Sequence, residues 1–285
     1  MASDSSTFPV RPSLARPLRN AVGRYRNIVR IYTAGFFVFL ITVFLILPTF
    51  LVVPMSLNDG SYLAFPPQGL TLKWYRAYFS DPDWMSATLF SLQVAFATAI
   101  VATTIGTTAA LALAKSRLPF KGLLQSLALG PMIVPHVVLG VSLYLVFSPW
   151  RVTGTFAGFV LAHTVLAIPY VMIVVGAAVQ KFDPSLELAA LNCGANRFQS
   201  FFLVMLPNIG PSVAAASVFA FLASFDDATV SFFISDIGGK SIGRKMFEDI
   251  DFNLTPVIAA ASTVLVAISL VLMTAAQLLT TRSRH

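Results

Sequence analysis

The strongest constraint on the fold of this chain is a series of apolar runs, each about as long as a membrane is thick. A helix needs roughly 20 apolar residues to cross the roughly 30 Å hydrocarbon layer of a bilayer. Six such runs can be drawn, covering residues 31–53, 86–114, 123–147, 155–179, 209–234 and 255–279. With 56% hydrophobic and 11% charged residues, the chain also has too little polar surface for a water-soluble domain. The sequence therefore predicts an all-α integral membrane protein with six transmembrane helices.

The positions of the basic residues predict how the chain is inserted. If the amino terminus is inside, the inner segments hold 13 of the 19 Lys and Arg residues and the outer loops hold 6. The positive-inside rule then places both termini in the cytoplasm. We expect a basic cytoplasmic segment over residues 1–30, a transmembrane domain over 31–281 and a cytoplasmic tail over 282–285. The net charge of +7 needs no nucleic-acid partner, because it marks this topology and the anionic inner leaflet.

A patterned segment lies between the fourth and fifth runs, on the predicted cytoplasmic side. Asp183 can cap a helix whose first residue is Pro184, and Gly194 is expected to end it. A second helical piece is expected over residues 196–206, with Pro207 starting the next segment. A short amphipathic helix held by a glycine turn suits docking into a groove on a cytoplasmic partner. The same periodicity also suits a helix that lies on the lipid headgroups.

The residues of this segment resemble the EAA loop of permease subunits in bacterial ABC importers. The motif runs Glu-Ala-Ala, three residues, Gly, and later Leu-Pro, and the stretch ELAALNCGANRFQSFFLVMLP (187–207) follows that spacing. Leu188 stands where the motif has its glutamate, and Glu187 lies one residue earlier. The resemblance implies that residues 181–207 couple to an ATPase. The contacts expected from it are Glu187, Leu188, Ala189, Ala190, Gly194, Ala195 and Pro207.

Beyond this loop the chain is most similar to permeases of the spermidine/putrescine-type importers. The resemblance is carried by the block ASFDDATVSFFIS (223–235) and by the segments before the loop and at the start of the sixth run. It implies a type I ABC importer fold in the bacterial cytoplasmic (inner) membrane. It also implies two ABC ATPase subunits, a second permease subunit, an extracytoplasmic substrate-binding protein and membrane lipid as partners. ATP and Mg would be bound by the ATPase subunits, so this chain is expected to be a transport subunit without a cofactor and not an enzyme.

The residues themselves agree with a chain that performs no chemistry. A nucleotide site would need a G-x-x-x-x-G-K-S/T loop, and GGKS at 238–241 lacks the first glycine because Ile234 occupies its place. The three histidines lie in separate segments, so no metal set or nucleophile triad is indicated. A single cysteine excludes an internal disulfide.

Charged residues inside the apolar runs indicate where a solute would pass. Asp226 and Asp227 are the only acidic residues in any run, and a carboxylate there costs roughly 3 kcal/mol unless water or a partner compensates. Adjacent helix positions point about 100° apart, so only one of the two is expected to face a pathway. A carboxylate could replace water around the ammonium group of a polyamine. It could also hydrogen-bond to a neighbouring helix and hold the end of the run.

His136 points to a different class of substrate. A histidine weakens attraction for a dication, so a zwitterion such as 4-aminobutyrate stays open as the substrate. His136 could equally hydrogen-bond to a backbone carbonyl freed by Pro131 and Pro135. His163 is interpreted as a packing residue that hydrogen-bonds to another helix.

The expected substrate pathway comprises Asp226, Asp227, Phe225, His136 and Tyr144. Phe225 and Phe232, seven residues apart on one helix face, could form a hydrophobic gate. Residues 244–252 could form a short outer helix that receives the binding protein. A secondary transporter is the rival class; such transporters usually show internal repeats, and none is clear in this sequence.

Overall fold

The computed structural model of this protein describes residues 15–116, 119–236, 240–252 and 254–282. The chain divides into two compact units, residues 1–51 and residues 52–285. The described part of the first unit belongs to one long helix, α1 (Ala15–Ser56). Its stretch Arg30–Ser56 is long and apolar enough to cross a membrane. Part of the predicted amino-terminal segment, residues 1–14, and residues 283–285 of the predicted tail lie outside the described residues.

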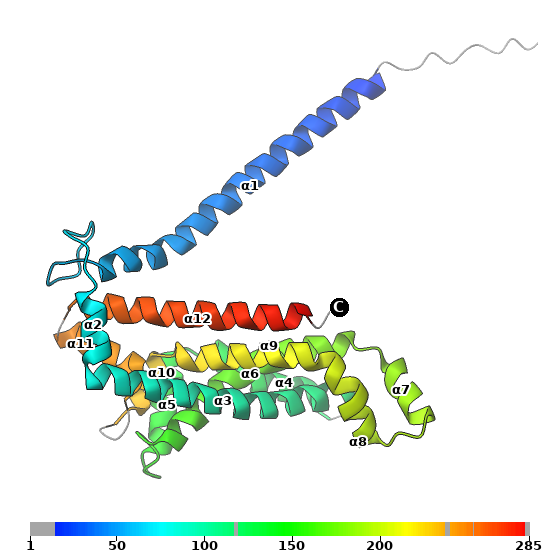
Figure 1. Ribbon diagram of the computed structural model, residues 1–285. Helices are drawn as coiled ribbons and strands as arrows, with labels where there is room; N and C mark the ends of the chain where they lie inside the picture. The colour runs from blue at the N-terminus through cyan, green and yellow to red at the C-terminus, as the bar shows by residue number, and fades with distance from the viewer. Residues whose placement is uncertain (1–14, 117–118, 237–239, 253, 283–285) are drawn as a thin grey trace, which may run out of the picture. The chain divides into compact units, whose positions relative to one another are not determined.

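The second unit is a bundle of helices with short helices at its two ends. Its elements are α2 (Lys73–Ser80), α3 (Pro82–Lys115), α4 (Lys121–Ile133), α5 (His136–Phe147), α6 (Phe156–Lys181), α7 (Pro184–Asn192), α8 (Arg197–Ser200), a π-helical turn (Phe201–Met205), α9 (Leu206–Phe225), α10 (Thr229–Ile234), α11 (Ile242–Phe252) and α12 (Val257–Arg282). Figure 1 shows α3, α6, α9 and α12 running alongside one another. In the same view α7 and α8 lie at one end of the bundle, and α2 and α11 lie at the opposite end.

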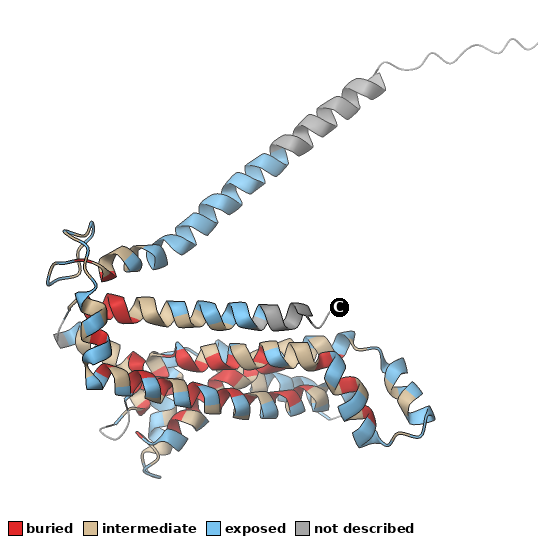
Figure 2. Ribbon diagram, viewed as in Figure 1, coloured by how far each residue is buried: buried red, intermediate tan, exposed pale blue. Residues whose placement is uncertain are grey.

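Small residues build the core between α3, α6 and α9. Ala95, Ala102, Ala167, Ala216 and Ala220 are fully buried there, and Figure 2 shows the buried positions concentrated on these helices. Small side chains let helix backbones approach closely, which supplies the van der Waals contact that holds helices together in lipid. The clearest case is the contact between α3 and α6. A Cβ added at Gly106 would lie 2.7 Å from the side chain of Val171.

The structure confirms the all-α class and shows that the third predicted run consists of two helices, α4 and α5. In the described chain, five helices are long and apolar enough to span a membrane, and a sixth span is possible only if the bent pair α4–α5 is one. The predicted run over residues 123–147 is thus divided into two helices, because α4 and α5 meet at 105°. Val134 is extended and Pro135 precedes α5. A residue before proline is sterically disfavoured in the helical conformation, and this explains the position of the break.

The fifth predicted run, residues 209–234, also has different limits. Helix begins at Arg197 and continues to Phe225, so the piece expected over 196–206 is joined to the span instead of stopping at Pro207. Pro207 has no N–H to donate to the carbonyl of Leu203, four residues earlier. The π-helical turn before it accommodates this loss. The side-chain amide of Asn208 donates to the carbonyl of Val204 at 2.7 Å. At the other end the helix stops before Asp226, and α10 starts at Thr229.

The close contact at Gly106 gives a test of this packing. Gly106→Leu should lower the free energy of unfolding by about 1–3 kcal/mol, because the added side chain overlaps Val171 on the facing helix. The measurement is thermal unfolding of the detergent-purified protein. Gly122→Leu is the matched control, since a Cβ built there meets no described atom within 4 Å apart from its chain neighbours and the backbone of its own helix. Equal stability of the two variants would contradict the α3–α6 contact.

Candidate functional site

Two helix breaks meet at one cavity. The break between α4 and α5 contributes Pro131, Met132 and His136 to its wall, and the break between α9 and α10 contributes Asp226 and Asp227. Leu166 and Tyr170 on α6 and Phe219 on α9 complete much of the lining, around a volume of about 410 Å³. We call this space the acid cavity.

Asp227 is held firmly at the start of α10. Its side chain is buried, and Oδ2 accepts a hydrogen bond from the backbone N–H of Ser231 at 3.0 Å. Its other oxygen, Oδ1, lies 3.6 Å from Nδ1 of His136. A carboxylate that binds a nearby backbone N–H offers the chain an alternative to continuous helix. The residue that lines the cavity therefore also stabilises the helix break.

Asp226 has a more open environment. Its side chain is exposed, and Oδ1 accepts a hydrogen bond from the hydroxyl of Ser269 on α12 at 3.4 Å. It borders the acid cavity and also a second cavity of about 520 Å³ between α9, α11 and α12. Both aspartates line the acid cavity, because they lie in a break and not at adjacent positions of a continuous helix; that only one of them faces a pathway stays a prediction.

Of the other three predicted pathway residues, one lines the acid cavity and two do not. His136 lines the acid cavity beside Asp227. Phe225 does not: its buried ring stacks on Phe221 at 5.4 Å in the core. Tyr144 on α5 is exposed and is not among the residues that line the acid cavity. The predicted gate of Phe225 and Phe232 on one helix face is wrong, because the break separates them and Phe232 packs against Phe247 of α11.

Sequence reasoning missed two aromatic residues of the cavity, Tyr170 and Phe219. Phe219 could have been found from the sequence, because Phe219, Leu222 and Asp226 follow the i, i+3, i+7 spacing of one helix face. Tyr170 directly follows Pro169 in α6, and no spacing in the sequence connects it to the aspartates. Both rings can attract a cation that enters the cavity.

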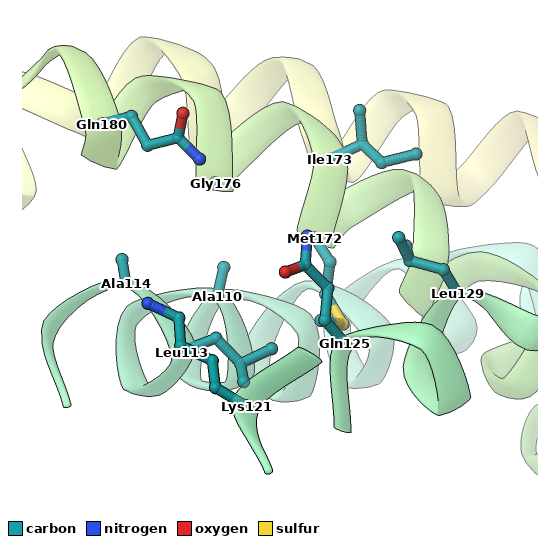
Figure 3. A pocket seen from close by; sticks show the side chains of 10 residues that line it. All are labelled: Ala110, Leu113, Ala114, Lys121, Gln125, Leu129, Met172, Ile173, Gly176 and Gln180. Carbon is teal, nitrogen blue, oxygen red and sulfur yellow. The ribbon is translucent and has the colours of Figure 1, made fainter. Parts of the chain in front are cut away.

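The face of α9 that borders the acid cavity continues toward the other end of the bundle. Asn208, Ser212 and Ala215 line a cavity of about 640 Å³, whose wall also includes Asp183 and Leu186 at the start of α7. A separate cavity of about 90 Å³ lies between α3, α4 and α6, and Figure 3 shows its polar side chains Lys121, Gln125 and Gln180. Among the described residues no carboxylate lines this smaller cavity, which distinguishes it from the acid cavity.

The predicted coupling segment (residues 181–207) has a defined geometry. The Asp183 side chain accepts from the N–H of Ser185 at 2.9 Å and caps α7, with Pro184 in its first turn. The same backbone hydrogen bond lowers the pKa of Asp183, so the cap stays charged at neutral pH. An Asn196–Gln199 capping box starts α8. The predicted start of α7 and its end before Gly194 are confirmed.

Gly194 ends α7 for a specific conformational reason. Its φ is +90°, a left-handed value that side chains rarely adopt. The N–H of Gly194 donates to Leu191 and the N–H of Ala195 donates to Ala190, at 3.0 and 3.1 Å. This is a Schellman motif, which satisfies the last carbonyls of a helix and favours glycine. It explains the spacing of Ala190, Gly194 and Ala195 in the sequence.

The remaining residues of the segment divide into one that is paired and several that are exposed. Glu187 forms an ion pair with Lys115 at the end of α3, which ties α7 to the bundle. Leu188 is 60% exposed, and Ala189 is exposed beside it. Leu186, Phe198 and Leu203 are also exposed apolar side chains of this segment. Pro207 lies in the first turn of α9.

Comparison with known proteins identifies the family. Residues 102–285 match the model of the binding-protein-dependent transport system inner membrane component. The chain belongs to this family. It is therefore a transport permease subunit and a multi-pass protein of the cytoplasmic membrane, as the sequence predicted.

Curated relatives extend the similarity along most of the permease. The chain is 27% identical over 256 residues to the spermidine/putrescine transport system permease protein PotC of Haemophilus influenzae, covering 90% of this chain and 99% of that protein. It is 29% identical over 229 residues to the putrescine transport system permease protein PotI of Escherichia coli, covering 78% and 81%.

Solved structures support the fold of the permease. A bacterial ABC transporter involved in alginate import matches with a TM-score of 0.67 at 14% identity, covering 93% of this chain and 99% of that chain. The MetNI methionine ABC transporter matches with a TM-score of 0.61 at 16% identity, covering 72% and 99%. The fold is therefore that of ABC importer permeases, as predicted.

The hydrogen bond at Asp227 predicts two different substitution effects on stability. Asp227→Asn keeps an oxygen that can accept from the N–H of Ser231 and should leave the free energy of unfolding close to that of the wild type. Asp227→Ala removes the acceptor and should cost about 1 kcal/mol. Chemical unfolding in detergent measures both. A larger loss in the asparagine variant than in the alanine variant would show that this hydrogen bond does not hold α10.

Proposed function

We propose that this chain is the permease subunit of an ATP-driven importer that moves polyamines, such as putrescine or spermidine, across the cytoplasmic membrane by alternating access. The observation that carries the proposal is the meeting of Asp226, Asp227 and His136 at one cavity between two broken helices. Two carboxylates in an otherwise apolar bundle are costly unless they have a partner. An ammonium group that has lost its water would be that partner.

The lining of the acid cavity fits an amine with an aliphatic chain. Its volume of about 410 Å³ lies in the range that small-molecule sites usually have. Asp226 and Asp227 supply charge, while Tyr170 and Phe219 supply rings that attract cations and pack against methylene groups. The names of the PotC and PotI relatives support the same substrate class.

Transport by this chain requires an external source of energy. The proposed source is a pair of ATPase subunits that bind ATP and Mg and that contact the coupling segment. Leu186, Leu188 and Phe198 give this segment an apolar exposed surface, which suits a groove on a partner better than it suits water. A second permease subunit, an extracytoplasmic binding protein and membrane lipid complete the proposed assembly, and no nucleic acid takes part.

The proposed docking surface for the binding protein includes α11. This helix, anticipated over residues 244–252, lies at the end of the bundle opposite α7. Lys245–Asp249 and Arg244–Glu248 ion pairs run along it at 3.0 Å. Charges of both signs on such a surface would orient an approaching partner.

A zwitterionic amine such as 4-aminobutyrate is the second candidate substrate. The observation that favours it is His136, which places an imidazole in the acid cavity where a substrate carboxylate could bind. Uptake of labelled putrescine with 4-aminobutyrate as competitor distinguishes the two, because effective competition favours the zwitterion.

The charge argument predicts a loss of transport when a carboxylate is neutralised. Asp227→Asn should reduce the maximal rate of putrescine uptake about tenfold or more at saturating binding protein, because a buried charged partner is lost. Asp226→Asn should reduce it less, since Asp226 is more exposed to water. Uptake into proteoliposomes that contain the complete transporter measures both.

Asp59→Asn is the control, because it removes an equal charge from an exposed outer residue paired with Lys73. Uptake by Asp227→Asn at the level of this control would refute the role of the acid cavity. A purified chain that transports without ATPase subunits would support a secondary transporter instead.

Coupling predicts a different effect at Gly194. Gly194→Leu should abolish uptake while the protein remains in the membrane, because a side chain at φ +90° costs about 1–2 kcal/mol and disturbs the end of α7. Gly194→Asn should retain part of the activity, since asparagine tolerates this conformation better. Copurification of the ATPase and the uptake rate are the two measurements. Wild-type uptake by Gly194→Leu would remove the coupling role from this turn.

A further inference from the structure

One buried histidine connects both sides of the break between α9 and α10. His163 on α6 is 2% exposed, and its Nδ1 lies 2.7 Å from the hydroxyl of Ser224 in the last turn of α9. Its Nε2 lies 3.1 Å from the hydroxyl of Ser231 in α10. The predicted interhelical hydrogen bond of His163 is thus confirmed, and it involves two partners on opposite sides of the break.

The chemistry of imidazole suits this bridge. A neutral imidazole has one nitrogen that donates and one that accepts, while a serine hydroxyl can do either. Both hydrogen bonds can therefore form together, in either tautomer, without a charge on the ring. An apolar side chain at this position would leave two buried hydroxyls without these bonds, and unpaired polar groups are costly in a low-dielectric interior.

The bridge reaches Asp227 through Ser231. The distance from His163 Nε2 to Asp227 Oδ2 is 3.7 Å, longer than a hydrogen bond. Ser231, however, donates its backbone N–H to the same Oδ2 while its side chain bonds to His163. Fixing Ser231 thus fixes one oxygen of Asp227 and leaves Oδ1 beside His136 in the acid cavity.

We infer that His163 is a positioning residue for substrate binding: by bonding to Ser224 and Ser231 across the break, it holds the Asp227 carboxylate in the acid cavity. This inference rests on the proposed function, in which Asp227 binds an ammonium group. His163 does not itself touch the substrate, since it is absent from the lining of the acid cavity among the described residues.

The test is equilibrium binding of radiolabelled putrescine to the purified complex of the permease and ATPase subunits, without the binding protein. His163→Ala should raise the dissociation constant for putrescine about tenfold, because the Asp227 carboxylate would lose a hydrogen bond that holds it in place through Ser231. His163→Gln, which can still donate and accept, should stay within about threefold of the wild type. Thr164→Ala is the matched control, because Thr164 is the buried neighbour on α6 and should leave the dissociation constant unchanged.

A double-mutant cycle tests whether His163 acts through Ser231. The variant that combines His163→Ala with Ser231→Ala should bind putrescine no more weakly than His163→Ala alone, because both substitutions remove the same hydrogen bond between the two side chains. Additive losses, or equal losses in His163→Ala and Thr164→Ala, would overturn the inference. If His163→Ala fails to assemble, His163→Gln and Ser231→Ala decide, and wild-type binding by Ser231→Ala would overturn it.

Asp227→Asn in the same assay separates the two proposals. Unchanged binding by Asp227→Asn, or no binding by the wild type, would refute the substrate site itself and the inference with it. Lost binding by Asp227→Asn together with wild-type binding by His163→Ala would refute only the role of His163.

Discussion

The need to satisfy backbone hydrogen bonds in hydrocarbon governs this structure. Helices meet that need internally, so an interruption at membrane depth is tolerated only where other groups or water cover it. The described chain interrupts its helices in this way before His136 and after Phe225, and both interruptions border the acid cavity. At the second break the Asp227 carboxylate accepts the backbone N–H of Ser231, and the Ser231 hydroxyl bonds to His163. The break and the proposed substrate site thus share the Asp227 carboxylate.

In the predicted coupling segment, the glycine of the EAA-like motif is explained by backbone geometry. Gly194 is needed for a left-handed turn, and the N–H groups after it satisfy carbonyls at the end of α7. Glu187, one residue before the usual motif position, pairs with Lys115, whereas Leu188 is exposed. In this chain the carboxylate is therefore used to hold α7 against α3, and an apolar side chain is presented outward in its place.

The sequence could predict the features that depend on local or compositional rules. Run length and hydropathy gave the membrane class, and Asp183, Pro184 and Gly194 gave the limits of α7, because caps and turns depend on a few adjacent residues. The same rules missed the break after Phe225, where no proline or glycine marks the site. The groups that meet at that break are far apart in the chain, since His163 is 61 residues from its partner Ser224. Tyr170 was missed for the same reason, since its place in the cavity follows from helix packing.

The continuous hydrogen-bonded path from α8 to α9 has a mechanical consequence. From Arg197 to Phe225 the chain is helical over 29 residues, about 43 Å at 1.5 Å per residue, which exceeds the roughly 30 Å of hydrocarbon. The backbone stays helical from α8 through the π-helical turn to α9, which ends beside Asp226, but Figure 1 shows the chain changing direction between α8 and α9. A displacement of α8 would reach α9 and Asp226 only through this π-helical turn, so the geometry of the turn would set the direction in which the carboxylates move.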